Sequence, residues 1–351
     1  MAMTEDRSKG VEQNREHHSD DSFKESKREV WAKIIEQIRS AENILVVAHQ
    51  SPDPDAFGSS CGMTLALKYF GKNALCLNQD GAAPHLQYIP DAFAVTDTVP
   101  AGEWDLIIVC DCGEKERIGS ELLNQLPQGV PIVNLDHHYS NDNFGDLNLV
   151  LPNASSASEI VFEVVSDLLG TLTPEIAECL LTGIIADTGG FRYSSATAYT
   201  FIVAEKLIKA GANLERVNRN LFSNRSLAAV RLAAAAISAM KIHAAGKVVE
   251  ILVTEEMMQR FSAQPTDCEG LVDAGRDIEG VCVSILIRKD GDLWKVSLRS
   301  KYSECNVSEV AATFNGGGHV QAAACRWSGE LEDLRSSLLA KVIQVVNDSG
   351  K

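Results

Sequence analysis

The sequence predicts an α/β protein made of two domains that follow one another along the chain. Three observations support this prediction. In the first part of the chain, short apolar runs typical of buried strands alternate with segments of helical periodicity. An alanine-rich helical stretch follows over 214–243. Beyond it, two strand-like segments flank Lys289-Asp290-Gly291-Asp292, which is a strong hairpin signal.

The alternation in the first part of the chain predicts a largely parallel sheet that is covered by helices on both faces. This domain is expected to cover residues 29–212. We expect strands over 44–48, 74–77, 104–110 and 131–135, and helices starting near Val30 and over 56–70, 156–169 and 175–185.

The remaining chain is expected to form a helical linker over 213–246 and a smaller α+β domain with a mixed sheet over 247–351. Residues 1–28 are polar and mixed in charge, which predicts a disordered tail. In the second domain we expect strands over 247–254, 281–288, 293–299 and 321–326, a helix over 307–314 and a closing helix from Glu330.

Composition and charge exclude several classes of protein. Nine cysteines are scattered without a Cys-x-x-Cys pair, and no secretory segment is visible, which predicts reduced thiols and a cytoplasmic protein. No apolar run approaches the roughly 20 residues needed to cross a bilayer, so no membrane partner is expected. A net charge of −16 argues against binding long duplex nucleic acid. For the surface as a whole, we interpret the acidity as keeping the protein in solution. An acidic protein that handles phosphates would in addition need metal cations.

Acidic and histidine residues stand at four places where a predicted strand ends or a helix begins, which is where ligands bind in open α/β sheets. His49, Asp53 and Asp55 follow the first strand, and the prolines between them stiffen the turn. Asp111 ends the strand over 104–110. Taken separately, each of these residues could be a turn or helix-cap residue.

The other two clusters have the same character. Asp136-His137-His138 ends a strand, and adjacent histidines can supply one metal-binding imidazole and one that hydrogen-bonds a phosphate oxygen. Asp187 ends an apolar helix, where a carboxylate is costly unless it is paired or bound to a metal. A polar loop and a surface carboxylate are the alternative interpretations.

A glycine run stands out in the second domain. Asn315-Gly-Gly-Gly-His319 lacks side chains at three consecutive positions, so backbone N–H groups can approach an anionic ligand closely. Such runs also occur as flexible loops. Arg299, near the end of a predicted strand, is suited to a bidentate phosphate contact.

Together these motifs resemble the DHH phosphoesterases that carry a DHH-associated C-terminal domain. The resemblance rests on their order in the chain and covers residues from about 30 to 345. Ala324 departs from the family pattern, which usually has glycine there. The motifs are His49-x-x-Pro-Asp53-x-Asp55, Asp111, Asp136-His137-His138, Asp187-Thr-Gly and Gly316-Gly-Gly-His319.

The resemblance implies a site for two Mn²⁺ ions, with Mg²⁺ or another divalent ion as the alternative. Carboxylate and imidazole ligands without thiolates suit these ions. A hydroxide activated by two metals would attack phosphorus. His138 would contact the scissile phosphate, and Asp136 would support the ligands. The implied ligands are His49 and Asp53 for one ion, Asp55, His137 and Asp187 for the other, and Asp111 as the bridge.

The resemblance also implies a phosphoric-ester hydrolase that degrades oligonucleotides of two to five nucleotides to mononucleotides, with either polarity of cleavage. Some similar enzymes also convert 3′-phosphoadenosine 5′-phosphate to AMP. Alternatives are a phosphodiesterase for linear or cyclic dinucleotides and a catalytically silent nucleotide sensor. A homodimer is compatible with the sequence. The implied substrate-binding residues are Arg299, Ser300, Gly316, Gly317, Gly318 and His319.

Overall fold

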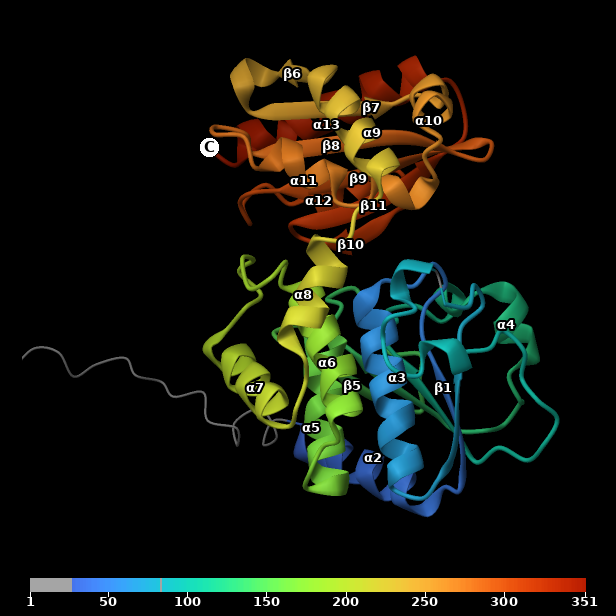
Figure 1. Cartoon of the computed structure of the whole chain (residues 1–351). Helices are drawn as coiled ribbons and strands as arrows, with labels where there is room; N and C mark the ends of the chain where they lie inside the picture. Colours follow the sequence, from blue (N-terminus) through green and yellow to red (C-terminus); the bar gives the residue numbers. More distant parts are fainter. Residues whose placement is uncertain (1–26, 83) are drawn as a thin grey trace, which may run out of the picture. The chain divides into compact units, whose positions relative to one another are not determined.

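The computed structural model describes residues 27–82 and 84–351, which form two compact units (Figure 1). The first unit contains the described residues up to His137 together with Asn141–Asn218, and the second contains His138–Ser140 and Arg219–Lys351. The predicted tail falls almost wholly on residues 1–26, which lie outside the described residues. The predicted domain limits, 29–212, 213–246 and 247–351, remain a prediction.

Five parallel strands form the sheet of the first unit in the order β2-β1-β3-β4-β5. The strands are β1 (Asn43–Val47), β2 (Asn73–Leu77), β3 (Leu106–Cys110), β4 (Ile132–Asp136) and β5 (Leu147–Val150). The central strand β3 is apolar and buried at every position because helices and loops cover both faces of the sheet. The predicted α/β class with a parallel first sheet is therefore confirmed.

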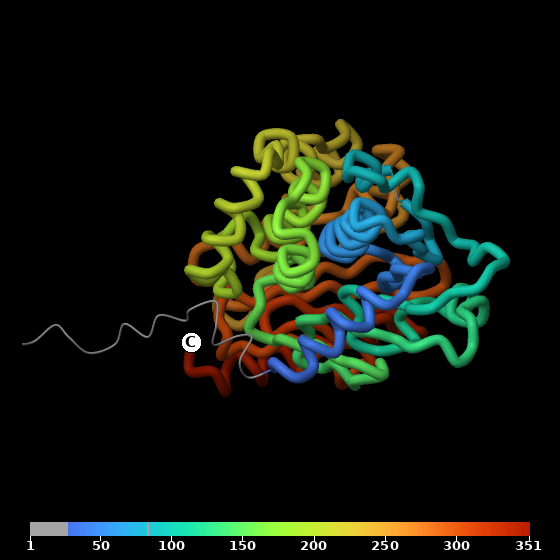
Figure 2. Tube along the Cα trace, turned by 90° about the horizontal axis from the view of Figure 1, so that it is seen from below, coloured from blue at the N-terminus to red at the C-terminus, as the bar shows by residue number. Residues whose placement is uncertain are grey.

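Helices pack against both faces of this sheet. α3 and α5 contact one face, whereas Leu122 of α4 joins the apolar cluster on the other face. α6 lies along α3 (Figures 1 and 2), and a Cβ atom at Gly58 of α3 would lie 2.5 Å from the Cys179 carbonyl oxygen of α6. Glycine thus allows the two helices to approach closely. The helices are α2 (Arg28–Ser40), α3 (Pro54–Tyr69), α4 (Ser120–Gln125), α5 (Ala157–Leu169), α6 (Pro174–Asp187) and α7 (Ala198–Lys209).

The second unit contains a mixed six-stranded sheet in the order β10-β11-β9-β8-β7-β6, in which only β7 and β8 pair in parallel. The strands are β6 (Lys241–His243), β7 (Val248–Val253), β8 (Val283–Asp290), β9 (Leu293–Ser300), β10 (Gly317–His319) and β11 (Ala322–Trp327). The glycine run, for which no strand was predicted, thus forms part of an edge strand, because its backbone pairs with β11.

Two apolar clusters cover the two faces of the second sheet. Alternate strand residues such as Val296 and Leu298 pack with α12 and α13, whereas Leu286 packs with α9 and α11. The predicted helical stretch over 214–243 is interrupted, because Ser226 starts a new helix as its N-cap, and it ends in strand β6. The helices are α8 (Leu214–Phe222), α9 (Leu227–Ser238), α10 (Glu255–Phe261), α11 (Leu271–Arg276), α12 (Val307–Ala312) and α13 (Leu331–Asp348).

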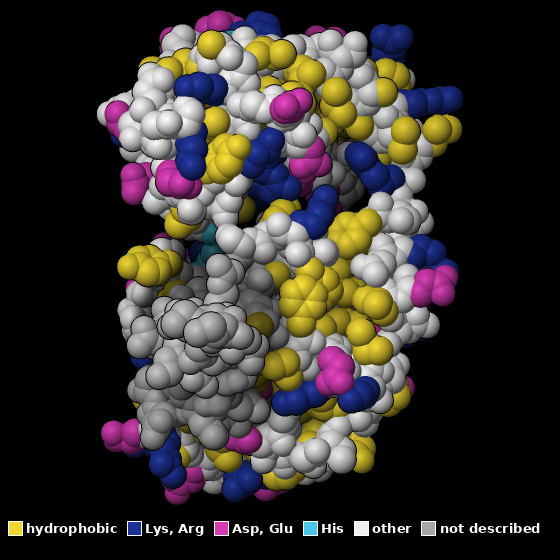
Figure 3. Space-filling view, turned by 90° about the vertical axis from the view of Figure 1, so that its left-hand side faces the viewer, with side chains coloured by type: hydrophobic (Ala, Val, Ile, Leu, Met, Phe, Trp, Pro, Cys, Tyr) yellow, Lys and Arg dark blue, Asp and Glu magenta, His cyan; other side chains and the backbone are white. Residues whose placement is uncertain are grey.

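The surface in Figure 3 carries Lys and Arg side chains interspersed with Asp and Glu side chains. In the part of the chain that the structure describes, none of the helices combines the length and apolar character required to span a membrane.

Candidate metal centre

The acidic and histidine clusters of the first unit meet at one edge of its sheet. Because β1, β3 and β4 are parallel neighbours, their carboxyl ends lie side by side at that edge. Asp111 follows β3 directly, and Asp136 is the last residue of β4. Asp111 has a φ of 55°, a left-handed conformation that Asp and Asn adopt more readily than most residues. The strand end therefore turns sharply at the residue that carries the carboxylate.

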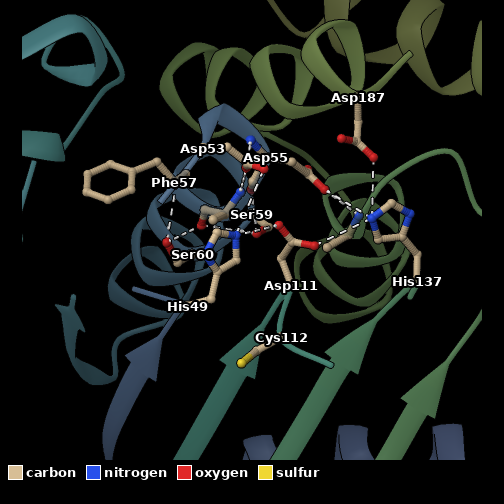
Figure 4. Close-up of polar contacts among 12 residues, drawn as sticks. His49, Asp53, Asp55, Phe57, Ser59, Ser60, Asp111, Cys112, His137 and Asp187 are labelled. Atoms are coloured by element: carbon tan, nitrogen blue, oxygen red, sulfur yellow. Dashed lines mark hydrogen bonds and ion pairs between the residues drawn. The ribbon is translucent and has the colours of Figure 1, made fainter. Parts of the chain in front are cut away.

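Two helices bring further carboxylates to this edge (Figure 4). Asp53 is the N-cap of α3, and its side chain accepts hydrogen bonds from the backbone N–H groups of Asp55 at 2.9 Å and Ala56 at 3.0 Å. Asp187 is the last residue of α6, which packs along α3. The packing of these two helices therefore places the end of α6 near the start of α3.

His49 points one ring nitrogen toward two carboxylates. Its Nδ1 lies 2.8 Å from the carbonyl oxygen of Gln50, which can only accept a hydrogen bond, so Nδ1 carries a proton. Its Nε2 lies 3.6 Å from Asp111 Oδ2 and 3.9 Å from Asp53 Oδ2. In the neutral ring, the lone pair of Nε2 faces these carboxylates and is available to a cation.

His137 repeats this arrangement on the other side of Asp111. Its Nδ1 lies 3.4 Å from the Ala154 carbonyl oxygen. Its Nε2 lies 3.3 Å from Asp187 Oδ2, 3.5 Å from Asp111 Oδ1 and 3.9 Å from Asp55 Oδ2. A backbone carbonyl thus orients each of the two histidines so that Nε2 faces the acidic cluster.

Asp111 lies between the two histidines, with one carboxylate oxygen directed at each ring. Within the first unit, two groups of potential ligand atoms share it, and within each group the atoms lie within 4.8 Å of one another. The arrangement is therefore suited to two cations that share one carboxylate. The groups are His49, Asp53 and Asp111, and Asp55, Asp111 and His137.

Asp55 is held by the N-terminus of α5. Its Oδ2 accepts a hydrogen bond from the Ala157 backbone N–H at 2.7 Å, and its Oδ1 accepts one from the Ser158 N–H at 3.0 Å. The positive end of the helix dipole favours a carboxylate at this position. A Cβ atom at Gly183 of α6 would lie 2.3 Å from Asp55 Oδ1, so only glycine leaves room for this carboxylate.

The crowded negative charges and the burial of the cluster shift the pKa values of its side chains. Burial raises the pKa of Asp55 to about 7, and nearby Asp111 contributes to the shift. Burial alone would lower the pKa of His49, but Asp111 and Asp53 outweigh it and raise the value to about 9. Burial acts in the same way on His137, whose pKa Asp111 and Asp187 nevertheless raise well above its usual range. Without a cation, protons therefore partly neutralise the cluster.

The chemistry of the donors fits a divalent cation. Around Asp111 the potential ligands are carboxylate oxygens and imidazole nitrogens, and no thiolate takes part in these groups within residues 27–82 and 84–351. The nearby Cys112 thiol donates to the Glu114 carbonyl oxygen at 3.1 Å, and burial raises its pKa to about 12. Such a donor set suits Mn²⁺ or Mg²⁺ better than structural zinc.

Affinity for Mn²⁺ is expected to increase as the pH rises from about 6 to about 9. His49 has a pKa of about 9 in the metal-free protein, and it must lose its proton before Nε2 can bind a cation. Below that pH, cation binding has to release the proton, which lowers the apparent affinity. Calorimetric titration at neutral pH, in two buffers of different ionisation enthalpy, should show proton release. A pH-independent affinity without proton release would contradict the assignment of His49.

Asn141 is a residue of this site that the sequence did not reveal. Its Nδ2 donates to Asp136 Oδ2 at 2.6 Å and to Asn134 Oδ1 at 2.8 Å, and it lies 3.3 Å from the Cys112 carbonyl oxygen. Asn141 therefore ties the chain after β4 to the segment that follows Asp111. No local sequence signal distinguishes it from an ordinary loop asparagine.

Replacing Asn141 with alanine is expected to lower metal affinity or turnover by about 10- to 100-fold, because residues that orient ligands typically have effects of this size. Asn148→Ala is the matched control, since the Asn148 side chain hydrogen-bonds the backbone of Asn143 and Gly145. The measurements are Mn²⁺ titration, kcat and Tm for both variants. If Asn141→Ala changed only Tm, as the control should, the proposed positioning role would be wrong.

The predicted substrate-binding residues lie in the second unit. Arg299 on β9 is half-buried, and its Nε lies 3.9 Å from Asp273 Oδ1 of α11. Ser300 is buried, and its hydroxyl donates to the Tyr302 carbonyl oxygen at 2.6 Å, so this hydroxyl stabilises the turn after β9. His319 ends β10 and is half-buried.

The glycine run, predicted to bind substrate, is also required by the packing of the sheet. A Cβ atom at Gly316 would lie 2.2 Å from the Ala324 carbonyl oxygen, and one at Gly318 would lie 2.5 Å from that of Ala322. These two glycines are therefore required for pairing with β11. Only at Gly317 would a Cβ atom meet nothing within 4 Å, so this position leaves space above the backbone.

Comparisons with known proteins agree with this architecture. Residues 43–184 match the DHH family, N-terminal domain, and residues 245–348 match the DHHA1 domain. The bifunctional oligoribonuclease and PAP phosphatase NrnA of Thermus thermophilus is 31% identical over 333 residues, which cover 91% of this chain and 96% of that protein. The protein of the same name from Bacillus subtilis is 28% identical over 295 residues, covering 83% of this chain and 91% of that protein.

A solved structure shows a similar arrangement of the chain. The exopolyphosphatase-related protein from Bacteroides fragilis superimposes with a TM-score of 0.82 at 26% identity, covering 90% of this chain and 96% of that one. The fold and the site define a hydrolase of phosphoester bonds with a divalent-metal site. The chain belongs to the DHH family, with a DHHA1 domain after the DHH domain, which confirms the resemblance seen in the sequence.

Proposed function

We propose that the protein hydrolyses oligonucleotides of two to five nucleotides to mononucleotides and also converts 3′-phosphoadenosine 5′-phosphate to AMP. The names of the Thermus thermophilus and Bacillus subtilis relatives, which join these two activities, support both parts of the proposal. The observation that carries hydrolysis is that Asp111 belongs both to the group of ligand atoms with His49 and to the group with His137. The nine free thiols support a reducing compartment, the cytoplasm, as the place of action.

We further propose that the site binds two Mn²⁺ ions, and the mixed carboxylate and imidazole donors support this choice. When bound, these ions would lower the pKa of water and offset negative charge at phosphorus. The protein holds Asp55 by two backbone N–H groups and each histidine by a carbonyl oxygen, so the ligands need little reorganisation. The proposed ligands are His49 and Asp53 for one ion, Asp55, His137 and Asp187 for the other, and Asp111 for both.

Two further residues of the DHH motif have proposed roles in the reaction. Asp136, fixed by Asn141, supports the ligand shell, because it stands directly before His137 at the end of β4. His138 contacts the scissile phosphate. In the second unit, Arg299 and His319 bind the substrate, and the open backbone at Gly317 allows close approach of an anion. Gly316, Gly318 and Ser300 shape this region through the contacts described above.

The test is a panel of turnover assays on the purified full-length protein with Mn²⁺. The substrates are labelled two- to five-nucleotide RNAs, a long single strand, 3′-phosphoadenosine 5′-phosphate, linear and cyclic dinucleotides, and pyrophosphate. The proposal predicts the highest kcat/KM for the short linear oligonucleotides and measurable turnover of 3′-phosphoadenosine 5′-phosphate. Faster turnover of pyrophosphate or of a cyclic dinucleotide than of linear dinucleotides would overturn the choice of substrate.

A further inference from the structure

A row of three cations crosses the sheet of the second unit. Lys295 on β9 lies directly opposite Arg288 on β8 and directly opposite Arg326 on β11. Side chains that are directly opposite on neighbouring strands share a face of the sheet, and like charges in such positions are destabilising. In a protein with a net charge of −16, a row of this kind calls for an explanation.

Acidic groups neutralise this row only in part. Asp290 accepts hydrogen bonds from Arg288 Nη1 at 3.1 Å and from Arg326 Nε and Nη2 at 3.3 and 3.2 Å. Lys295 is half-buried, and burial lowers its pKa; Arg288 and Arg326 lower it further, while Asp290 and Glu269 oppose the shift. Asp290 and Glu269 thus offset part of the positive charge of the row, and an additional anion would be favourable here.

The row shares its face of the sheet with the predicted substrate-binding residues. Because side chains alternate along a strand, Lys295, Ser297 and Arg299 of β9 point to one face. His319 lies on the same face, because Ala322 of β11 pairs with Arg299 on one side and with His319 on the other. Between the two ends, Ser297 pairs with Ala324, and Ala324 pairs with Gly317. On β9, β11 and β10 the rung between the cations and Arg299 thus carries only small side chains, whereas on β8 it carries the buried Leu286.

We propose that Arg288, Lys295 and Arg326, here called the cation row, bind a backbone phosphate of an oligonucleotide whose end is held near Arg299 and His319. Lys295 and Arg299 are four residues apart on one strand, which corresponds to about 13 Å. One phosphate group cannot reach both positions, so the cation row contacts a different nucleotide of the same chain. This inference rests on the proposed function, and it adds that oligonucleotides longer than a dinucleotide gain a second anchor.

The experiment measures binding of labelled five-nucleotide and two-nucleotide RNAs to the metal-free full-length protein by fluorescence anisotropy. Lys295→Met removes the charge and keeps most of the aliphatic stem. The expected result is a roughly tenfold weaker binding of the five-nucleotide RNA with unchanged binding of the dinucleotide. The slope of log Kd against log salt should also become smaller by about 0.7, as expected for one lost contact to a single strand.

Lys289→Met is the matched control, because Lys289 lies on the same hairpin but on the opposite face, with its ammonium 4.4 Å from the Trp294 ring centroid. It should change neither the affinities nor the salt slope. The proposed role of the cation row would be overturned if Lys295→Met lost equal affinity for both RNAs or lost none. It would also be overturned if the wild type did not bind the five-nucleotide RNA. Failure of the proposed function is seen separately, as absent hydrolysis of dinucleotides by the wild type with Mn²⁺.

Discussion

Replacing Asp111 by asparagine is expected to lower kcat/KM for a dinucleotide by about a thousandfold or more, because one side chain is lost from both groups of ligand atoms. Asparagine tolerates the left-handed backbone at this position, where φ is 55°, so the change should leave the fold intact. In the metal-free protein, removing this carboxylate relieves repulsion with Asp55 but also takes away a partner of the protonated His49 and His137, so the Tm is expected to change little. The measurements are steady-state kinetics with Mn²⁺ and the Tm of the metal-free protein.

Asp105→Asn is the matched control, since Asp105 precedes β3 whereas Asp111 follows it. Asp105 Oδ2 accepts hydrogen bonds from the backbone N–H groups of Glu42 at 2.9 Å and Asn43 at 2.8 Å, at the other end of the same sheet. This variant should lose some stability and keep its kcat/KM. Wild-type activity in Asp111→Asn, or a similar loss in both variants, would contradict the bridging role of Asp111.

Replacing Gly183 by alanine is expected to weaken Mn²⁺ binding by about a hundredfold. The new Cβ atom would lie 2.3 Å from Asp55 Oδ1 and 2.0 Å from Ser158 Oγ, so the Asp55 carboxylate has to move. Alanine is the better helix former by up to about 1 kcal/mol, which means that a weaker α6 helix cannot explain the loss. Calorimetric Mn²⁺ titration and the Tm of the metal-free protein separate the two effects.

Two further variants identify the contact that matters. Ser158→Ala alone should have a small effect, because the backbone N–H groups that hold Asp55 remain. The double variant Gly183→Ala with Ser158→Ala should stay impaired, since the contact with Asp55 persists. Full recovery of Mn²⁺ affinity in the double variant would show that displacement of Asp55 is not the cause of the loss.

The parts of the fold that the sequence predicts best are those with strong local signals. The apolar runs of β1, β3 and β4 and the hairpin between β8 and β9 are all present. The strand ends then indicate the site, because the carboxyl ends of neighbouring parallel strands share one edge. For this reason Asp111 and His137, although distant in sequence, lie close together as expected.

Other features depend on packing that leaves little local trace. The short strand β5 contains a polar asparagine, and its apolar run is too brief to be recognised. Strand β10 consists largely of glycine, which has low strand propensity, and it exists because its backbone pairs with β11. Asn141 and Gly183 matter only through neighbours that are distant in sequence. The cation row likewise appears only when the register of three strands is known.

The most direct test of the account is anomalous diffraction at the manganese edge from crystals of the protein grown with Mn²⁺. The account predicts two peaks about 3.5–4 Å apart, one on each side of the Asp111 carboxylate, with the His49 and His137 Nε2 atoms as ligands of different ions. A single peak, or two peaks that do not share Asp111, would contradict the claim that this carboxylate joins two metal ions.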